Sequence, residues 1–337
     1  MDSAAFVLMI KLAALMIMVI VGYAAVKFHV VESKESATIS RLIVYILQPC
    51  LICRAYQIEI TPDRVNGFVC ALVFGVGTYI IWIILLRLLG KRMKLDEVDQ
   101  CNLIFSNVGN LALPLIGMIL GNEYVFYASA LQIPFNLFVW TYGISFISGQ
   151  KHLNFRKILL NPNIVALTTG LLLCFFRIRL PNVIDTAMEG LGDMVGPGSM
   201  LVIGMVVAES DLKKVFTDKR AYAICLGRLI IMPASILLLF SLTGIPGKMP
   251  LLVPVFQVCF IALCTPPAST VSQLTVLYNK KAYETGVYNV LSMILCVVTM
   301  PLMLAVFQKL FTLKNRENGF RPETFLQRGI TCENSDC

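Results

Sequence analysis

Long apolar runs separated by short polar segments cover the chain almost to residue 309. A run of about twenty apolar residues is long enough to cross the hydrocarbon layer of a bilayer. The pattern therefore predicts ten transmembrane spans, of which the second and sixth are the shortest. They cover residues 5–28, 39–55, 65–89, 101–120, 125–147, 161–176, 183–208, 221–242, 251–277 and 282–307. Residues 310–337 form a polar tail for which we expect no packed structure.

The fourth span carries polar and helix-breaking residues at its centre, CNLIFSNVGNLALPLIGMILG. Pro114 has no amide hydrogen, and in a regular helix its ring clashes with the carbonyl of Asn110. Backbone groups freed at membrane depth must face protein or a water-filled cavity, because lipid cannot hydrogen-bond them. We predict a helix broken at Pro114. A kinked helix whose freed groups bond to a neighbour is the alternative for this span taken alone.

The ninth span has a comparable interruption, Pro266-Pro267, which begins 152 residues after Pro114. Likewise, Pro197 in the seventh span, within Gly196-Pro197-Gly198, follows Pro49 in the second span by 148 residues. Because a unit of five spans has an odd number of crossings, its second copy enters the membrane from the opposite side. We predict an all-α fold with an inverted repeat of five plus five spans, residues 1–150 and 157–309. Such folds bind substrate near the bilayer midplane.

The composition supports a polytopic membrane protein, since 57% of the residues are apolar and only 14% are charged. The net charge of +8 is spread over the loops and indicates topology, not nucleic-acid binding. The amino-terminal run lacks a basic start and a cleavage site, so we expect it to remain as a span. Cys50 and Cys53 form a CxxC motif, but no second pair or histidine lies near it. We predict no metal site and no cofactor.

The distribution of Lys and Arg predicts the orientation of the chain. Sixteen of these residues flank the loops after odd-numbered spans, and five flank the loops after even-numbered spans. Positively charged loops remain in the cytoplasm. We therefore predict that both termini are extracytoplasmic.

Two broken helices supply two half-helix amino termini, whose free N–H groups and partial positive charge favour a carboxylate. Uncharged donors that could bind it lie beside both interruptions. Together with the prolines of the breaks, the predicted substrate-binding residues are Asn107, Asn110, Pro114, Gln132, Asn136, Thr265, Pro266, Pro267, Ser269 and Thr270. The alternative is that the polar residues only cap the broken helix ends, and Ser269 and Thr270 fit both interpretations equally.

Arg228 is a further candidate, because it lies well inside the eighth span, where an isolated cation is costly. It could attract the anion or bond to a carbonyl of a broken helix. Alternatively, its side chain extends to the cytoplasmic surface. A separate motif, Asn161-Pro162-Asn163, fits a helix start with Asn161 as the cap and Pro162 in the first turn.

Several motifs follow one another along nearly the whole chain. In the first half, Asn107 precedes Pro114-Leu115 by seven residues, and Asn136 and Gly143 lie in the fifth span. The second half begins with Asn161-Pro162-Asn163 ahead of Gly170. It continues with Arg228 and Pro233, then Pro266-Pro267, then Thr299-Met300-Pro301-Leu302. With these motifs in this order and at this spacing, the chain resembles the auxin efflux carrier family. That family includes plant auxin carriers and bacterial carriers of malate and related organic acids.

The resemblance implies that spans four and nine are crossed broken helices. They would lie in a transport domain of spans three to five and eight to ten. Spans one, two, six and seven would form a scaffold, against which the transport domain moves in an elevator-like shift. The short connection at residues 149–157 is similar to the bacterial members, because the plant carriers have a long loop there. We expect a plasma-membrane carrier of a small organic anion, with a homodimer through the scaffold spans as one option.

Three other functions are weighed against this one. A sodium-coupled symporter of the bile-acid type has similar crossed breaks and would be indicated by sodium-dependent uptake. An intramembrane enzyme is disfavoured, because the spans contain no HExxH, no aspartate pair and no Ser-His pairing. A receptor would leave the aligned prolines without a purpose. No carboxylate lies at the centre of a span, so coupling to protons or sodium stays open.

Overall fold

The computed structural model of the protein describes residues 3–59, 61–149, 159–209 and 212–312. Within these residues the chain is helical, and its extended contact is an isolated bridge between Ser106 and Pro267. The α-helices of the first part are α1 (Ser3–Lys27), α2 (Ser36–Leu42), α3 (Gln48–Ala55), α4 (Pro62–Leu89), α5 (Glu97–Ile104), α6 (Leu113–Leu120), α7 (Asn122–Ala130), α8 (Gln132–Phe138) and α9 (Ile144–Ser148).

The second part continues the series. Its α-helices are α11 (Pro162–Phe175), α12 (Asn182–Asp193), α13 (Val195–Glu209), α14 (Leu212–Thr217), α15 (Lys219–Leu226), α16 (Met232–Thr243), α17 (Ile245–Lys248), α18 (Val253–Leu263), α19 (Ser269–Leu277) and α20 (Ala282–Phe307). Two short 3₁₀ turns are η1 (Ser33–Glu35) and η6 (Pro250–Leu252). The π-turns are η2 (Ile43–Leu47), η3 (Val108–Ala112), η4 (Val139–Gly143), η5 (Gly227–Ile231) and η7 (Gln308–Thr312).

Six continuous helical stretches of the described chain are long and apolar enough to cross a membrane. They are Ser33–Ala55, Pro62–Leu89, Glu123–Ser148, Asn182–Ala208, Lys219–Thr243 and Ala282–Phe311, at the positions of predicted spans two, three, five, seven, eight and ten. Shorter apolar stretches lie at the positions of predicted spans one, four, six and nine: Ala14–Lys27, Val108–Gly117, Pro162–Phe175 and Val253–Leu263. The all-α membrane class is confirmed. The count of ten spans stays a prediction, because six stretches meet the length and apolarity that a span requires.

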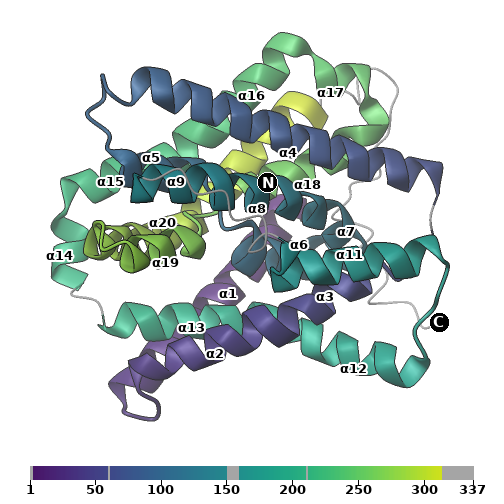
Figure 1. Ribbon diagram of the computed structural model, residues 1–337, viewed down its shortest axis with the longest axis horizontal. Coiled ribbons are helices and arrows are strands. Elements are labelled where there is room, and N and C mark those ends of the chain that lie inside the picture. Colours follow the sequence, from purple (N-terminus) through teal and green to yellow (C-terminus); the bar gives the residue numbers. More distant parts are fainter. Residues whose placement is uncertain (1–2, 60, 150–158, 210–211, 313–337) are drawn as a thin grey trace.

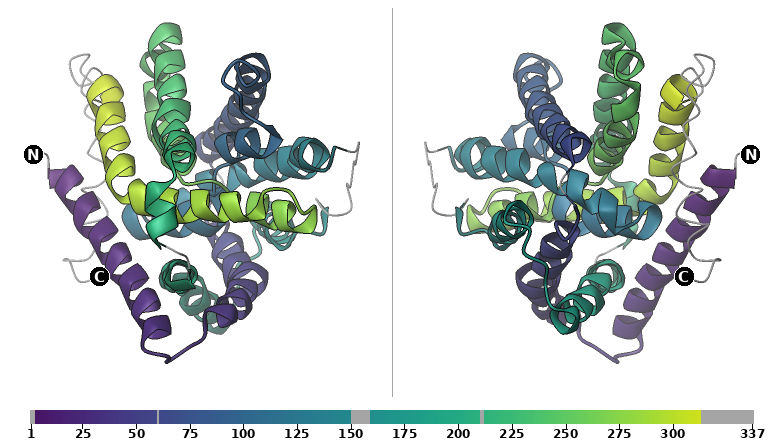
Figure 2. Two further views of the ribbon diagram at one scale, coloured as in Figure 1. Left: turned by 90° about the vertical axis from the view of Figure 1, so that its left-hand side faces the viewer. Right: turned by 90° about the vertical axis from the view of Figure 1, so that its right-hand side faces the viewer.

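The helices pack in two groups. In one group, α1 packs along α13, and α3 packs against α11 and α12. In the other, α4 contacts α7, α8 and α18, and α20 contacts α15, α18 and α19. Figure 1 shows α2, α3, α12 and α13 along one side of the molecule and α4 and α16 along the opposite side. Figure 2 shows the same two sides from the ends of the molecule.

Apolar side chains cover parts of the outer surface as well as the core. On α4, Val69, Val73, Ile84 and Leu88 are all exposed. The other side of the same helix carries Trp82, which is fully buried. An apolar outer face of this kind is what a bilayer covers.

Pro49, Pro114 and Pro233 lie in helical runs that continue past them, which corrects the predicted breaks at Pro49 and Pro114. A π-turn precedes each proline, and the residue directly before the proline donates its N–H to a carbonyl five residues back. The bonds join Gln48 N to Ile43 O before Pro49, Leu113 N to Val108 O before Pro114, and Met232 N to Gly227 O before Pro233. The wider turn changes the geometry that makes a proline ring clash in a regular α-helix. The fourth span is interrupted at residues 105–107 instead.

The expected interruption at Gly196-Pro197-Gly198 is smaller than predicted. One turn residue, Met194, separates α12 from α13, and Pro197 lies in the first turn of α13. Proline is tolerated there, because the first N–H groups of a helix have no partner within it.

Two glycines bring α1 and α13 into backbone contact. A Cβ atom on Gly22 would lie 2.2 Å from Leu201 O, and one on Gly204 would lie 2.0 Å from Val19 O. Small residues allow membrane helices to approach this closely, so that their backbones pack directly. The crossing of α1 and α13 therefore depends on the absence of these two side chains.

We predict that Gly204→Ala destabilises the protein, because the added methyl group must push α1 away from α13. Forced overpacking costs about 1–3 kcal/mol. The thermal unfolding midpoint of detergent-purified protein should fall by several degrees.

The matched control is Gly286→Ala in α20, where a Cβ atom would meet nothing within 4 Å. This variant should keep or raise the midpoint, because alanine favours helix over glycine by about 1 kcal/mol. Equal midpoints for the two variants would contradict the close crossing.

Candidate functional site

Two helices are interrupted and then restart after a few non-helical residues. α5 ends at Ile104 and η3 begins at Val108, so residues 105–107 lie between helices. α18 ends at Leu263 and α19 begins at Ser269, which leaves residues 264–268 between them. Each interruption creates one helix carboxyl end and one helix amino end.

The two interruptions bond to each other through their backbones. Asn107 N donates to Pro266 O at 2.9 Å, and Ala268 N donates to Phe105 O at 2.8 Å. Ser106 and Pro267 form the antiparallel bridge between these bonds. Because proline has no N–H, Pro266 and Pro267 bring no unpaired donor to the interruption. Each break thus satisfies backbone groups that the other break leaves free.

Asn107 connects the two half-helices that begin at the breaks. Its Oδ1 accepts a hydrogen bond from Asn110 N at 3.3 Å, as a cap of η3. Its Nδ2 donates to the hydroxyl of Ser269, the first residue of α19, at 3.4 Å. The side chain is only 6% exposed. The cap interpretation is therefore realised for Asn107, and its Nδ2 lies where both amino ends meet.

The other predicted residues at the breaks lie in different surroundings. Thr265 is buried, and its hydroxyl donates to Ala262 O at 2.8 Å, back toward α18. Thr270 and the side chain of Asn110 are half-buried. Pro114 is buried inside the continuous helical run of η3 and α6.

Arg228 joins the carboxyl ends of the two interrupted helices. Its guanidinium donates to Leu103 O at 2.9 Å, Leu263 O at 2.7 Å and Thr265 O at 3.1 Å. The side chain is fully buried, with its guanidinium carbon 4.9 Å from the centre of the Trp82 ring. A position at the cytoplasmic surface is therefore wrong. The structure has Arg228 on backbone carbonyls, whose partial negative charge stabilises a cation.

Gln132 and Asn136 lie one turn apart on α8, and both are buried. Asn136 Nδ2 donates to Gln132 O at 2.8 Å and lies 3.4 Å from Gln132 Oε1. Gln132 Nε2 has no hydrogen-bond partner among the described residues. Its amide therefore has a donor to offer, whereas the donor of Asn136 is used within the helix.

Gln48, which the sequence analysis did not select, belongs beside these residues. It is the first residue of α3, it is fully buried, and within the described chain neither its Nε2 nor its Oε1 has a partner. The available signal was a glutamine inside an apolar span, directly before Pro49. A buried polar side chain without partners is rare and calls for an explanation.

A family model described as a membrane transport protein matches residues 7–154 and 150–304. The chain belongs to this family of membrane transport proteins. The match agrees with the auxin efflux carrier motifs of the sequence. None of the curated proteins compared with the chain matches it.

The Asn161-Pro162-Asn163 motif of the transporter begins α11 as predicted. Asn161 caps the helix, since its Oδ1 accepts from Asn163 N at 2.9 Å, and Pro162 occupies the first turn. Asn163 is buried, and its Oδ1 has no partner among the described residues. The motif thus sets the start of a helix that packs against α3 and α8.

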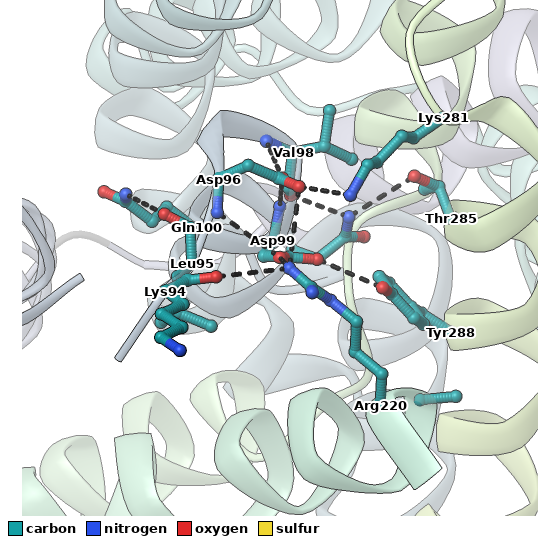
Figure 3. Close-up of polar contacts among 12 residues, drawn as sticks. Lys94, Leu95, Asp96, Val98, Asp99, Gln100, Arg220, Lys281, Thr285 and Tyr288 are labelled. Atoms are coloured by element: carbon teal, nitrogen blue, oxygen red, sulfur yellow. Dashed lines mark hydrogen bonds and ion pairs between the residues drawn. The ribbon is translucent and has the colours of Figure 1, made fainter. Parts of the chain in front are cut away.

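The transporter also holds a cluster of ion pairs at the start of α5, shown in Figure 3. Asp99 is fully buried and accepts from the Tyr288 hydroxyl at 3.0 Å and from the guanidinium of Arg220. Arg220 also lies 3.6 Å from Asp96, which pairs with Lys281. The cluster therefore ties α5 to α15 and α20.

The environment of the cluster shifts the pKa values of Asp96 and Lys281, among others. Burial alone would raise the pKa of Asp96, but its bonds from Lys281 and the Asp99 N–H, with the charge of Arg220, hold the pKa below its usual value. The bond to Asp96 raises the pKa of Lys281. Both groups are therefore charged at neutral pH.

We predict that Arg228→Met destabilises the transporter strongly, because three buried carbonyls lose their donor. Each unsatisfied group costs about 1–3 kcal/mol. The unfolding midpoint should fall far more than in Arg41→Met, where an exposed arginine bonds to Ala37 O and the Thr38 hydroxyl of its own helix. An unchanged midpoint in Arg228→Met would show that the carbonyls do not need the cation.

A second prediction concerns the buried carboxylate. Arg220→Met should cost about 2 kcal/mol, less than a fully buried pair, because Arg220 is half exposed. Adding Asp99→Asn should restore most of this loss, because the remaining buried group is then neutral.

Thermal unfolding of both variants, with Lys219→Met as an exposed control, tests the pairing. If the double variant is less stable than Arg220→Met alone, Asp99 does not depend on Arg220.

Proposed function

We propose that this membrane transport protein carries small organic anions, such as malate or another carboxylate, across the plasma membrane by alternating access. One observation carries the proposal: the amino ends of two half-helices meet, and Asn107 joins them by bonding to Asn110 N and to the Ser269 hydroxyl. Helix amino ends carry free N–H groups and a partial positive charge, which favour a carboxylate over a cation.

The side chains at this point are suited to an exchangeable ligand. The bond from Asn107 Nδ2 to Ser269 is long, at 3.4 Å, so replacing it with a bond to a carboxylate oxygen costs little. The amide nitrogen of Asn107 has two hydrogens to donate. Because the amide is uncharged, it forms no buried salt bridge that a ligand would have to break. Arg228 stabilises the carboxyl ends of the broken helices and leaves the amino ends to the substrate.

A topology of ten spans, as a five plus five inverted repeat with crossed breaks, fits the way the loops gather. Residues near the ends of predicted spans three, seven and nine meet in the ion-pair cluster, at the left of Figure 1. Residues near the ends of spans two and six line one cavity, and residues from the loops after spans two and four, with the start of span nine, line another. The described loops that follow odd-numbered and even-numbered spans thus gather in different places, which fits ten crossings in either orientation.

The two helix groups support a scaffold of spans one, two, six and seven and a transport domain of the other six. A cavity of about 30 Å³ lies where α1 and α13 face α6 and α20. Its lining is apolar and includes Met16, Met200, Met293 and Met300. Methionine adapts to changed neighbours, so such an interface suits an elevator-like shift. A homodimer through the scaffold spans stays part of the proposal.

We propose that the membrane potential drives export of the anion. An inside-negative potential contributes about 2.3 kcal/mol per charge per 100 mV. Among the described residues Asp99 is the buried carboxylate, and it is held by Arg220 and Tyr288 at the start of α5, away from the two amino ends. Membership in a transport family favours transport over catalysis, and sodium-coupled symport is the alternative that the assay below distinguishes.

We predict that Asn107→Asp lowers uptake of malate at least tenfold in proteoliposome counterflow. Aspartate still accepts the bond from Asn110 N and caps the helix, but it offers no donor and repels a carboxylate. Labelled malate entry into malate-loaded vesicles is measured with and without a sodium gradient. If malate uptake depends on the sodium gradient, the protein is a sodium symporter and not a uniporter.

The matched control is Asn161→Asp, the same substitution at the cap of α11. It should keep wild-type exchange. If Asn107→Asp keeps full activity, the paired amino ends are not the substrate site. If the wild type exchanges no carboxylate, the protein is not an organic-anion carrier.

A further inference from the structure

Two glutamines from different helix groups converge on one glycine. A Cβ atom built on Gly109 would lie 2.7 Å from Gln132 Nε2 and 3.0 Å from Gln48 Nε2. Gln48 is fully buried and Gln132 is 1% exposed. Both amide nitrogens lack a partner among the described residues, as does Gln48 Oε1.

Burial of these amides without partners is costly, at about 1–3 kcal/mol for each unsatisfied group. Protein cores avoid that cost by pairing such groups or by replacing them with apolar residues. Gln48 lies in an apolar span, where a leucine would fill the same space without the penalty. The two amides are therefore available to bind a ligand.

The position of Gly109 relates this pair to the carboxylate site. Gly109 is the second residue of η3 and lies two residues after Asn107, within the first turn of the half-helix. One helical turn rises about 5.4 Å. A group bound by the two glutamines would thus lie only a few bonds from a carboxylate held at the amino end.

The chemistry of the amides indicates the kind of group. Each glutamine carries both a donor and an acceptor, and neither carries a charge. A hydroxyl can accept from one amide and donate to the other, and a carbonyl can accept from both. A second carboxylate would be bound better by a cation, but Arg228 is bonded to three carbonyls.

We propose that Gln48 and Gln132 form a second subsite that binds an uncharged oxygen substituent, a hydroxyl or a carbonyl, next to the carboxylate of the substrate. The subsite selects hydroxy or oxo acids over the unsubstituted acids. This inference rests on the proposed function, since it extends the same site. Because Gln48 belongs to the proposed scaffold and Gln132 to the proposed transport domain, the substituent also bridges the two.

The test is competition in the counterflow assay between malate and succinate, which differ by one hydroxyl. Wild-type protein should be inhibited at least tenfold more effectively by unlabelled malate than by succinate. Gln48→Met, of similar length without hydrogen bonds, should reduce this ratio to within about twofold of one and change inhibition by succinate little. Gln132→Met should reduce the malate-to-succinate ratio in the same way. Gly109→Ala should also reduce it, because the added methyl group enters the space between the two glutamines.

The control is Gln100→Met, which removes a buried amide that bonds to Leu95 O at the other end of α5. It should keep the wild-type ratio. The subsite alone is rejected if malate and succinate inhibit the wild type equally. It is also rejected if Gln48→Met and Gln132→Met weaken inhibition by malate and by succinate to the same extent. Absence of exchange with every acid rejects the carrier function as well, so the two failures are distinguishable.

Discussion

The backbone bonds between the two helix interruptions are the constraint on which the rest of the structure depends. A broken helix exposes donors and acceptors that lipid cannot satisfy. Here Asn107 N bonds to Pro266 O and Ala268 N bonds to Phe105 O, so neither break is complete without the other. Segments about 160 residues apart in the chain must therefore fold together.

The charges around this junction are separated by the direction of the helices. The carboxyl ends of α5 and α18 receive the guanidinium of Arg228, whereas the amino ends of η3 and α19 meet uncharged side chains. Because it is buried and bonded to three carbonyls, Arg228 is a structural residue that holds the two interrupted helices together. The amino ends keep their positive potential for a ligand, because no carboxylate of the described residues neutralises them.

Hydropathy was sufficient to predict the six long apolar helices, because the cost of placing a segment in lipid depends mainly on its composition. The predicted span at residues 282–307 coincides with α20, and the cap at Asn161 was visible as a local motif. Local information did not find the true interruption at residues 105–107, because its partner lies in a distant part of the chain. Pro114 was misread since a π-turn has no sequence signal comparable with that of the proline.

The candidate site was predictable only in part for the same reason. Asn107 could be named from its position in an apolar span, but its double contact with Asn110 and Ser269 depends on the pairing of the breaks. The role of Arg228 stayed open until its carbonyl partners, from two other helices, were known. Gln48 was not named at all, because its importance comes from its convergence with Gln132 on Gly109.

The π-turn η2 has a consequence for the angular phase of the second membrane helix. A π-turn holds one residue more than the corresponding α-turn, and one residue rotates a helix face by about 100°. Gln48 directly follows this turn. The extra residue therefore decides which side of α3 faces Gly109, so that a single inserted residue is enough to aim a polar side chain at the interior.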